Sequence, residues 1–471
     1  MMRCLSSAAA ACCGRTFRLM STEAFVLSLE KVQHQLSVSE RKQDLILHGR
    51  QLFENETLDD IHTAWNPVVA GKICHAATQL RISPTKGQPF GAVLELSLTP
   101  EATDATDASS LARIAHSCLV LRSPQLYEIL FTYIRKLIAV APTLDTVSCA
   151  VLINAYGRAQ VHHEELYRAL CDRAAIVMRD QRTFIAHIAN VAHALARVQY
   201  FHRDLFLVLR DQAERQASQG PPLVAVTILD GFAEVGFVDD ALFTALEQRL
   251  IGEVHDLPAP LMASLVSCLA KAGRAPSALF TACGERIVAT GSIFDSNSIA
   301  RTCDAFRRAN VAAEEVFGTL AERACKVVTD FRVDEINLTL SALASFDLFD
   351  GELFPLLASR FVSTVKQGGF VNPVDAAGIL ASFAAVQERS DELVHVCTQL
   401  LSTHREAIDG MTLVQSLWAC IVLNVRNEAQ QNLLQCLTSG AVALPDESTA
   451  AKESKVALDR LLTVKKAYGF K

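Results

Sequence analysis

The chain has 471 residues, half of them hydrophobic and 20% charged, which is enough for two or three domains or one long repeat array. Glycine and proline are scarce, at 21 and 14 residues, and this favours a mostly helical protein with short loops. No stretch has the ~18 uninterrupted apolar residues of a membrane-spanning helix, and a net charge of −7 disfavours non-specific attachment to nucleic acid.

Residues 1–20 have the composition of a mitochondrial transit peptide. The stretch carries Arg3, Arg15 and Arg18, is rich in serine and alanine, and precedes the first acidic residue, Glu23. Such an arginine-bearing, acid-free start is typical of mitochondrial import signals. A secretory signal is the alternative, but its apolar region, LSSAAAACC, would be short and weakly hydrophobic. We predict import into the mitochondrial matrix, with cleavage near Met20.

The next region, residues 21–98, contains helical patterns such as FVLSLEKVQHQL and VVAGKICHAATQL. These patterns fit either one or two divergent repeats or a separate helical region. The segment TPEATDATDASS, at 99–110, indicates a linker or long loop.

A short phrase of Leu followed by an aromatic residue recurs through residues 111–437, at spacings of 37 to 40 residues. The first residues of the phrases, called anchors here, are Leu126, Leu166, Leu205, Leu242, Leu279, Val316, Leu353 and Leu393. A Leu or Cys follows four positions after each anchor, so the two side chains lie on one face of a helix.

The residues before each anchor predict a first helix and a tight turn. Eleven positions before the anchors stand small residues, which let neighbouring helices approach closely: Ala115, Ala155, Ala194, Gly231, Cys268, Ala305, Ala342 and Ser382. Six positions before them stand residues that tolerate a left-handed backbone: Gly236, Gly273, Asn310 and Asp347. Three positions before them stand candidate N-caps: Ser123, Asp239, Asp350 and Ser390.

Each unit is therefore a helical hairpin, and one hairpin alone cannot bury its apolar faces. Stacked hairpins can, so the sequence predicts an all-α protein, an α-solenoid of antiparallel hairpins. We expect about eight units, with a degenerate ninth at 414–437 as a C-terminal cap. Residues 438–471 are expected to form a loop and a short basic helix.

The 14 cysteines contain no C-x-x-C pair, and most occur on apolar helical faces. We predict buried, reduced thiols in a reducing compartment. Cys74-His75 and His162-His163 lack the spacing of zinc ligands, so no metal site is expected. The sequence also has no phosphate-binding loop, GxSxG, HExxH or paired-carboxylate signature. We therefore predict neither an enzyme nor a cofactor or small-molecule substrate.

Basic residues recur at the last turn of several first helices. Eight positions before the anchor stand Arg158, Arg197, Lys271 and Arg308, and Arg301 and Arg307 add charge in one repeat. Equivalent positions align along a solenoid, so these cations are candidate RNA contacts. The alternative is that they offset helix macrodipoles, as cations at helix C-termini commonly do.

The presequence and the 37-to-40-residue hairpins together resemble the organellar helical-repeat families. The phrase of a small residue, Leu-Phe and Leu is similar to heptatricopeptide and octotricopeptide repeats and to armadillo/HEAT arrays. The chain is also similar to helical-repeat subunits of kinetoplastid-type mitochondrial RNA-editing substrate-binding complexes. This resemblance implies a scaffold that holds other subunits of a multiprotein complex and contacts RNA, directly or through partners. The alternatives are a mitoribosomal or ribosome-assembly subunit and an armadillo/HEAT-type adaptor without RNA binding.

Overall fold

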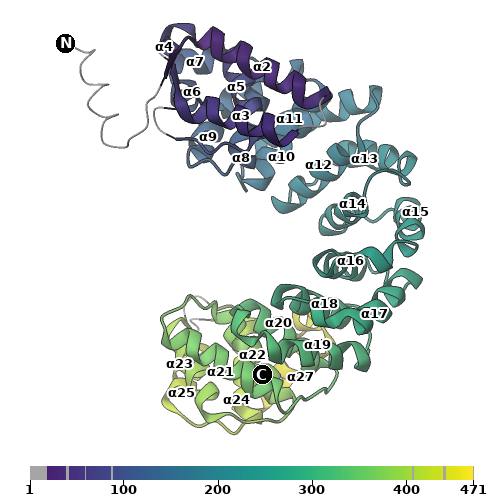
Figure 1. Ribbon diagram of the computed structural model, residues 1–471. Coiled ribbons are helices and arrows are strands. Elements are labelled where there is room, and N and C mark those ends of the chain that lie inside the picture. Colours follow the sequence, from purple (N-terminus) through teal and green to yellow (C-terminus); the bar gives the residue numbers. More distant parts are fainter. Residues whose placement is uncertain are drawn as a thin grey trace, which may run out of the picture. The chain divides into compact units, whose positions relative to one another are not determined.

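The computed structural model describes residues 18–38, 42–58, 60–85, 88–405, 408–438 and 442–469 (Figure 1). Residues 1–17, most of the predicted transit peptide, lie outside the described residues. In the described ranges the strands are β1 (Arg18–Met20) and β2 (Glu56–Leu58), which pair in parallel. None of the helices in these ranges is long and apolar enough to cross a membrane.

The chain divides into an N-terminal unit, Met1–Leu242, and a C-terminal unit, Phe243–Lys471. The boundary falls inside α15 (Asp240–Ile251), within the range that the sequence analysis treats as one array of repeats.

The N-terminal unit is built from stacked helices. They are α2 (Thr22–Val38), α3 (Lys42–Asn55), α4 (Ile61–Ala64), α5 (Pro67–Leu80), α6 (Pro89–Ser97), α7 (Pro100–Ala105), α8 (Ala108–Val120), α9 (Leu126–Val140), η2 (Ala141–Thr143), α10 (Thr146–Arg158), α11 (Glu164–Asp180), α12 (Ile185–Arg197), α13 (Arg203–Arg215) and α14 (Pro222–Glu234). The first helices α5, α8, α10, α12 and α14 pack one on the next and form the first-helix row of this unit. The second helices α9, α11 and α13 form a parallel row behind them.

The C-terminal unit repeats this arrangement. Its helices are α16 (Ala259–Lys271), α17 (Ala278–Thr290), α18 (Ser296–Arg308), α19 (Glu314–Lys326), α20 (Val333–Ser345), α21 (Leu353–Lys366), α22 (Pro373–Ala385), α23 (Asp391–Thr403), α24 (Gly410–Val422), α25 (Glu428–Thr438), α26 (Glu447–Glu453) and α27 (Lys455–Tyr468), with the 3-10 turns η3 (Val254–Asp256), η4 (Gly291–Ile293) and η5 (Val328–Asp330). The even-numbered helices α16 to α24 form the first-helix row, and α27 packs on α24. The predicted all-α solenoid of stacked hairpins is confirmed in both units.

Residues 99–110, expected as a linker or long loop, are largely helical. They contain α7 and the beginning of α8. Thr99 accepts a hydrogen bond from the Ala102 amide, and Pro100 occupies the first helical turn. An N-cap threonine followed by proline is a helix-start signal that outweighs the loop-like composition.

The anchors form the buried core of the second helices, with one change at the first repeat. Leu166, Leu205 and Leu242 are fully buried, whereas Tyr127 is 56% exposed. In α9 the buried pair is instead Ile129 and Leu130, so the first phrase begins 37 residues before Leu166. The sequence pattern places this anchor three residues too early, because Leu126-Tyr127 matches the Leu-aromatic phrase and Ile129-Leu130 does not.

The turns between first and second helices have a left-handed residue at a constant position. Gly236, Gly273, Asn310 and Asp347 have positive φ, between 52° and 71°, as their residue types predict. Three glutamines at the same position also have positive φ: Gln160 (53°), Gln199 (51°) and Gln387 (57°). The residue type of these three does not predict the conformation, because glutamine rarely adopts positive φ.

Small residues allow close contact between neighbouring first helices. A Cβ atom added to Gly231 in α14 would lie 2.8 Å from the carbonyl carbon of Ala192 in α12. One added to Gly157 in α10 would lie 2.5 Å from the backbone oxygen of Ala194. Both distances are too short for any real side chain, so these glycines set the spacing of the first-helix row in the N-terminal unit.

Candidate nucleic-acid interface

The candidate RNA-contacting residues occur at the ends of first helices in both units. Arg158 ends α10 and Arg197 ends α12, and these neighbouring helices present both side chains to solvent. In the C-terminal unit, Lys271 ends α16 and Arg308 ends the neighbouring α18. Each unit thus carries a pair of cations on adjacent first helices. A single ladder through both units stays a prediction.

An acidic residue partly neutralises the cations of α18. Asp304 accepts from Arg307 and from Arg308, each at 2.6 Å. Asp304 is nearly buried, so this carboxylate is fixed between the two guanidinium groups. The two arginines therefore present about one net positive charge. The i, i+4 spacing of Asp304 and Arg308 is a sequence signal that could have identified this pairing.

Arg301 has a different environment from the other two arginines of α18. Its Nη1 donates to the Ser264 hydroxyl of α16 at 2.9 Å. This contact joins the second turns of two neighbouring helices, so Arg301 has a structural bond as well as a charge. A side chain with this bond is a weaker candidate for an RNA contact than one that is fully exposed.

Histidines accompany the cations in the N-terminal unit. His75 in α5, His116 in α8 and His187 in α12 all have pKa values lowered by burial. His75, Arg158 and His187 lower the pKa of His116 further through their charges. These imidazoles are neutral at pH 7, so they add no positive charge to that of Arg158 and Arg197 at that pH.

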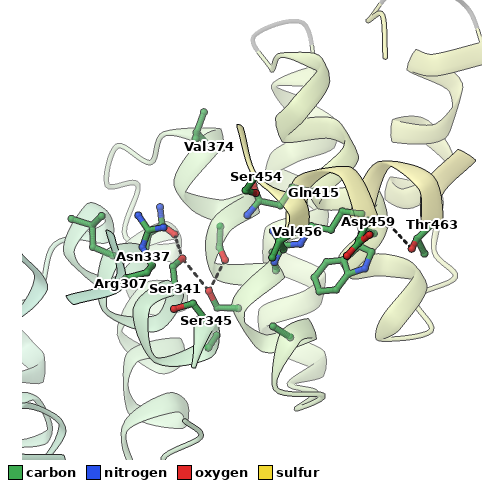
Figure 2. A pocket seen from close by; sticks show the side chains of 18 of the residues that line it. Arg307, Asn337, Ser341, Ser345, Val374, Gln415, Ser454, Val456, Asp459 and Thr463 are labelled. Carbon is green, nitrogen blue, oxygen red and sulfur yellow. Dashed lines mark hydrogen bonds between the residues drawn. The ribbon is translucent and has the colours of Figure 1, made fainter. Parts of the chain in front are cut away.

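The C-terminal unit contains a cavity of about 760 Å³, lined by α18, α20, α22, α24 and α27 (Figure 2). Arg307 lines it from α18, and Trp418 and Arg460 line it from α24 and α27. Asn337, Ser341 and Ser382 form a hydrogen-bonded chain along its wall, with links of 3.0 and 3.2 Å. No sequence pattern predicts this cavity, although Arg307 is one of the predicted RNA contacts.

The described cysteines are buried or half-buried free thiols. Burial raises the pKa of Cys118, Cys149 and Cys283 to about 12, so these thiols are protonated at neutral pH. Among the residues that the structure describes, no cluster of His, Cys, Asp and Glu could hold a metal ion.

These rows of hairpins, with cations at helix ends, define a helical-repeat protein of the α-solenoid class. A family model described as RNA-editing substrate-binding complex 6 protein matches residues 102–428, which is more than half of the chain. The match begins in α7 and ends at the first residue of α25. The chain therefore belongs to the family of RNA-editing substrate-binding complex 6 proteins. The resemblance to helical-repeat subunits of such complexes is confirmed. No curated protein matches the chain.

Proposed function

We propose that this chain is a non-catalytic scaffold subunit of a mitochondrial RNA-editing complex that binds partner proteins and contributes RNA contacts. The observation that carries the proposal is the family match, because it covers the stacked hairpins from α7 to the start of α25. A complex subunit whose matched region is a repeat array acts through its surfaces. The arginine-rich, acid-free start of the chain supports location in the mitochondrial matrix.

Exposed aromatic side chains support the binding of partner proteins. Phe184, before α12, is 75% exposed, and Phe370, before α22, is 92% exposed. Both lie in connections that lead into first helices, one in each unit. Large aromatic side chains contribute strongly to protein interfaces when a partner covers them.

The first-helix cations support direct RNA contact. Arg158 and Arg197 are exposed on neighbouring helices and can neutralise backbone phosphates. Lys271, Arg301, Arg307 and Arg308 would add contacts from the C-terminal unit. The three arginines of α18 are weaker candidates than Arg158 and Arg197, because Asp304 binds two of them and Ser264 accepts from the third.

An adaptor without RNA binding is the second candidate function. The net charge of −7 and the carboxylate of Asp304 both favour protein contacts over phosphate contacts. A ribosomal role has no comparable support in the structure.

Crosslinking of RNA to the tagged chain in mitochondria, with sequencing of the RNA and identification of co-purified proteins, tests the proposal. We expect editing-complex subunits in the sample and a strong loss of crosslinked RNA in the variant Arg158→Glu with Arg197→Glu. Arg215→Glu is the matched control, because Arg215 also ends a helix of the same unit and is exposed, but lies in the second row.

If crosslinked RNA falls equally in the Arg215→Glu control, the loss comes from charge at helix ends in general and not from the first-helix row. Recovery that is unchanged in both variants, with editing subunits present, would leave the adaptor. Absence of editing subunits from the sample would contradict the proposal as a whole.

A further inference from the structure

The cavity of the C-terminal unit has one wall that does not belong to the hairpin repeats. Helix α27 packs on α24 and presents Val456, Arg460 and Thr463 to the cavity (Figure 2). These positions are spaced four and three residues apart and so share one helical face. A volume of about 760 Å³ is within the range of sites that enclose a small ligand or a few residues of a peptide.

Arg460 is the chemically unusual group of this cavity. Its guanidinium lies over the Trp418 ring, 4.3 Å from the ring centre. Its Nε is buried and has no hydrogen-bond partner among the described residues. No acidic side chain in the described chain forms an ion pair with it. Burial lowers the pKa of Arg460, yet arginine stays charged at neutral pH.

A half-buried guanidinium with an unused donor is costly unless an acceptor reaches it. The chain itself supplies only the face of Trp418, which attracts the cation but accepts no conventional hydrogen bond. An oxyanion from outside would use the free donor and neutralise the charge. Arginine suits carboxylates and phosphates equally in geometry, so the surroundings must decide between them.

The surroundings of Arg460 disfavour a polyanion. Asp459 lines the same cavity, and Asn337, which also lines it, donates to Asp375 at 2.9 Å. At the far end Asp304 binds Arg307, the other cation of the lining. A run of RNA phosphates would meet these carboxylates in succession, whereas one carboxylate on Arg460 would not.

Apolar groups next to the cavity favour a polypeptide. Val374 and Val456 line the cavity and are 47% and 57% exposed. Both side chains can therefore bury apolar surface against an occupant. Gln415 and Thr463 also line it and carry groups that can bind a peptide backbone. An occupant with one acid and an aliphatic neighbour matches this lining.

We propose that this cavity binds a segment of a partner polypeptide, with an Asp or Glu carboxylate on Arg460 and an aliphatic side chain on Val374 and Val456. The inference rests on the proposed function only in assuming that the chain works with partner proteins. It adds the site on this chain and the chemistry of the segment that occupies it.

Site-specific photocrosslinking in the assembled complex tests the proposal. The full chain carries benzoylphenylalanine at Val456, and the crosslinked peptide is identified by mass spectrometry. Benzoylphenylalanine at Leu462 is the control, because Leu462 is 42% exposed on the same helix but does not line the cavity. We expect one polypeptide segment containing Asp or Glu from position 456, and a different pattern from position 462.

Substitutions then test the ion pair. Arg460→Gln should reduce the specific crosslink about tenfold, as expected for loss of a hydrogen-bonded charge, whereas Arg460→Lys should retain part of it. The control Arg426→Gln removes an exposed arginine outside the cavity and should change nothing. In the Arg460→Glu variant, the crosslink should return when the identified Asp or Glu of the partner segment is replaced by Lys.

The proposal would be overturned by a crosslink to RNA or by a crosslinked segment without Asp or Glu. It would also be overturned if Arg460→Gln left the crosslink unchanged, or if position 456 gave no specific crosslink. Co-purification of editing subunits, measured in the same samples, reports separately on the proposed function. Circular dichroism of each variant confirms that the helices are retained.

Discussion

The two units use the same hairpin but differ in the chemistry of their first-helix rows. The first helices α8, α10, α12 and α14 of one unit and α16, α18, α20, α22 and α24 of the other all have 13 residues. One position lies four residues before the last residue of each first helix. In the N-terminal unit it is occupied by His116, Asn154, His193 and Asp230. In the C-terminal unit it is occupied by Ser267, Asp304, Ser341, Ala381 and Trp418. The backbone register is therefore conserved between hairpins while this position changes freely.

Stacking of the hairpins requires some features of the sequence in both units, but it does not fix the residue at this position. Small buried residues and left-handed turns recur in both units, because every hairpin needs them to stack. The varied position has two histidines, an asparagine and an aspartate in the N-terminal unit, and two serines, an aspartate, an alanine and a tryptophan in the C-terminal unit. The following experiments compare the two units.

The largest expected effect comes from the glycines between first helices. Gly231→Ala should destabilise the N-terminal unit by about 1–3 kcal/mol or more, because the new methyl group would meet backbone atoms of Ala192 and His193. Gly378→Ala in the C-terminal unit should cost less, because its methyl group would meet the side chain of Asn337, which can rotate. Hydrogen exchange of each unit measures both effects. Equal losses would contradict the distinction.

The left-handed glutamines should give a smaller effect of opposite sign. Gln160→Gly and Gln387→Gly should each stabilise by about 1 kcal/mol, because glycine adopts positive φ without the steric cost. One position lies in each unit, so equal gains in the free energy of unfolding are expected. Asp347→Gly is the control and should gain less, since aspartate tolerates this conformation better than glutamine.

Mild acid should weaken the N-terminal unit selectively. The pKa values of His75, His116 and His187 are lowered in the folded chain, so the unfolded chain binds protons first as the pH falls. This contribution to stability is present above the unfolded histidine pKa, about 6.5, and is lost as the pH falls from there through the lowered pKa values of the folded chain. Hydrogen exchange at pH 7 and pH 5 should show the change, and His116→Gln should reduce it.

The smallest effect concerns RNA binding by the C-terminal unit. Asp304→Asn removes the carboxylate that binds Arg307 and Arg308, so it should free about one positive charge. If RNA reaches these arginines, the salt dependence of binding should steepen by a slope of about 0.7, the value for one further phosphate contact on a single strand. Asp334→Asn is the control, because Asp334 pairs with Arg332 on the neighbouring α20. Equal changes in both variants would exclude a specific role for α18.

The fold was predictable because its signal is repeated in every hairpin. One misplaced anchor, at Leu126, did not alter the period found in seven others. The boundary at 242/243 was not predictable, because the phrase continues through it unchanged.

The site was less predictable because its residues have no common period. Arginine and lysine residues at helix ends can be recognised one by one. The pairing of two of them with Asp304 is predicted only by their i, i+3 and i, i+4 spacing from it. The cavity was not visible at all. Trp418 and Arg460 are far apart in sequence, and they meet only because α27 folds back onto α24.

The positions of the tryptophans have a practical consequence. The chain has only two of them, Trp65 in the N-terminal unit and Trp418 in the C-terminal unit. Intrinsic fluorescence in the variants Trp65→Phe and Trp418→Phe therefore assigns an optical signal to each unit without any added dye. In the Trp65→Phe variant the single emitter lies beneath Arg460, so its spectrum also reports what enters the cavity.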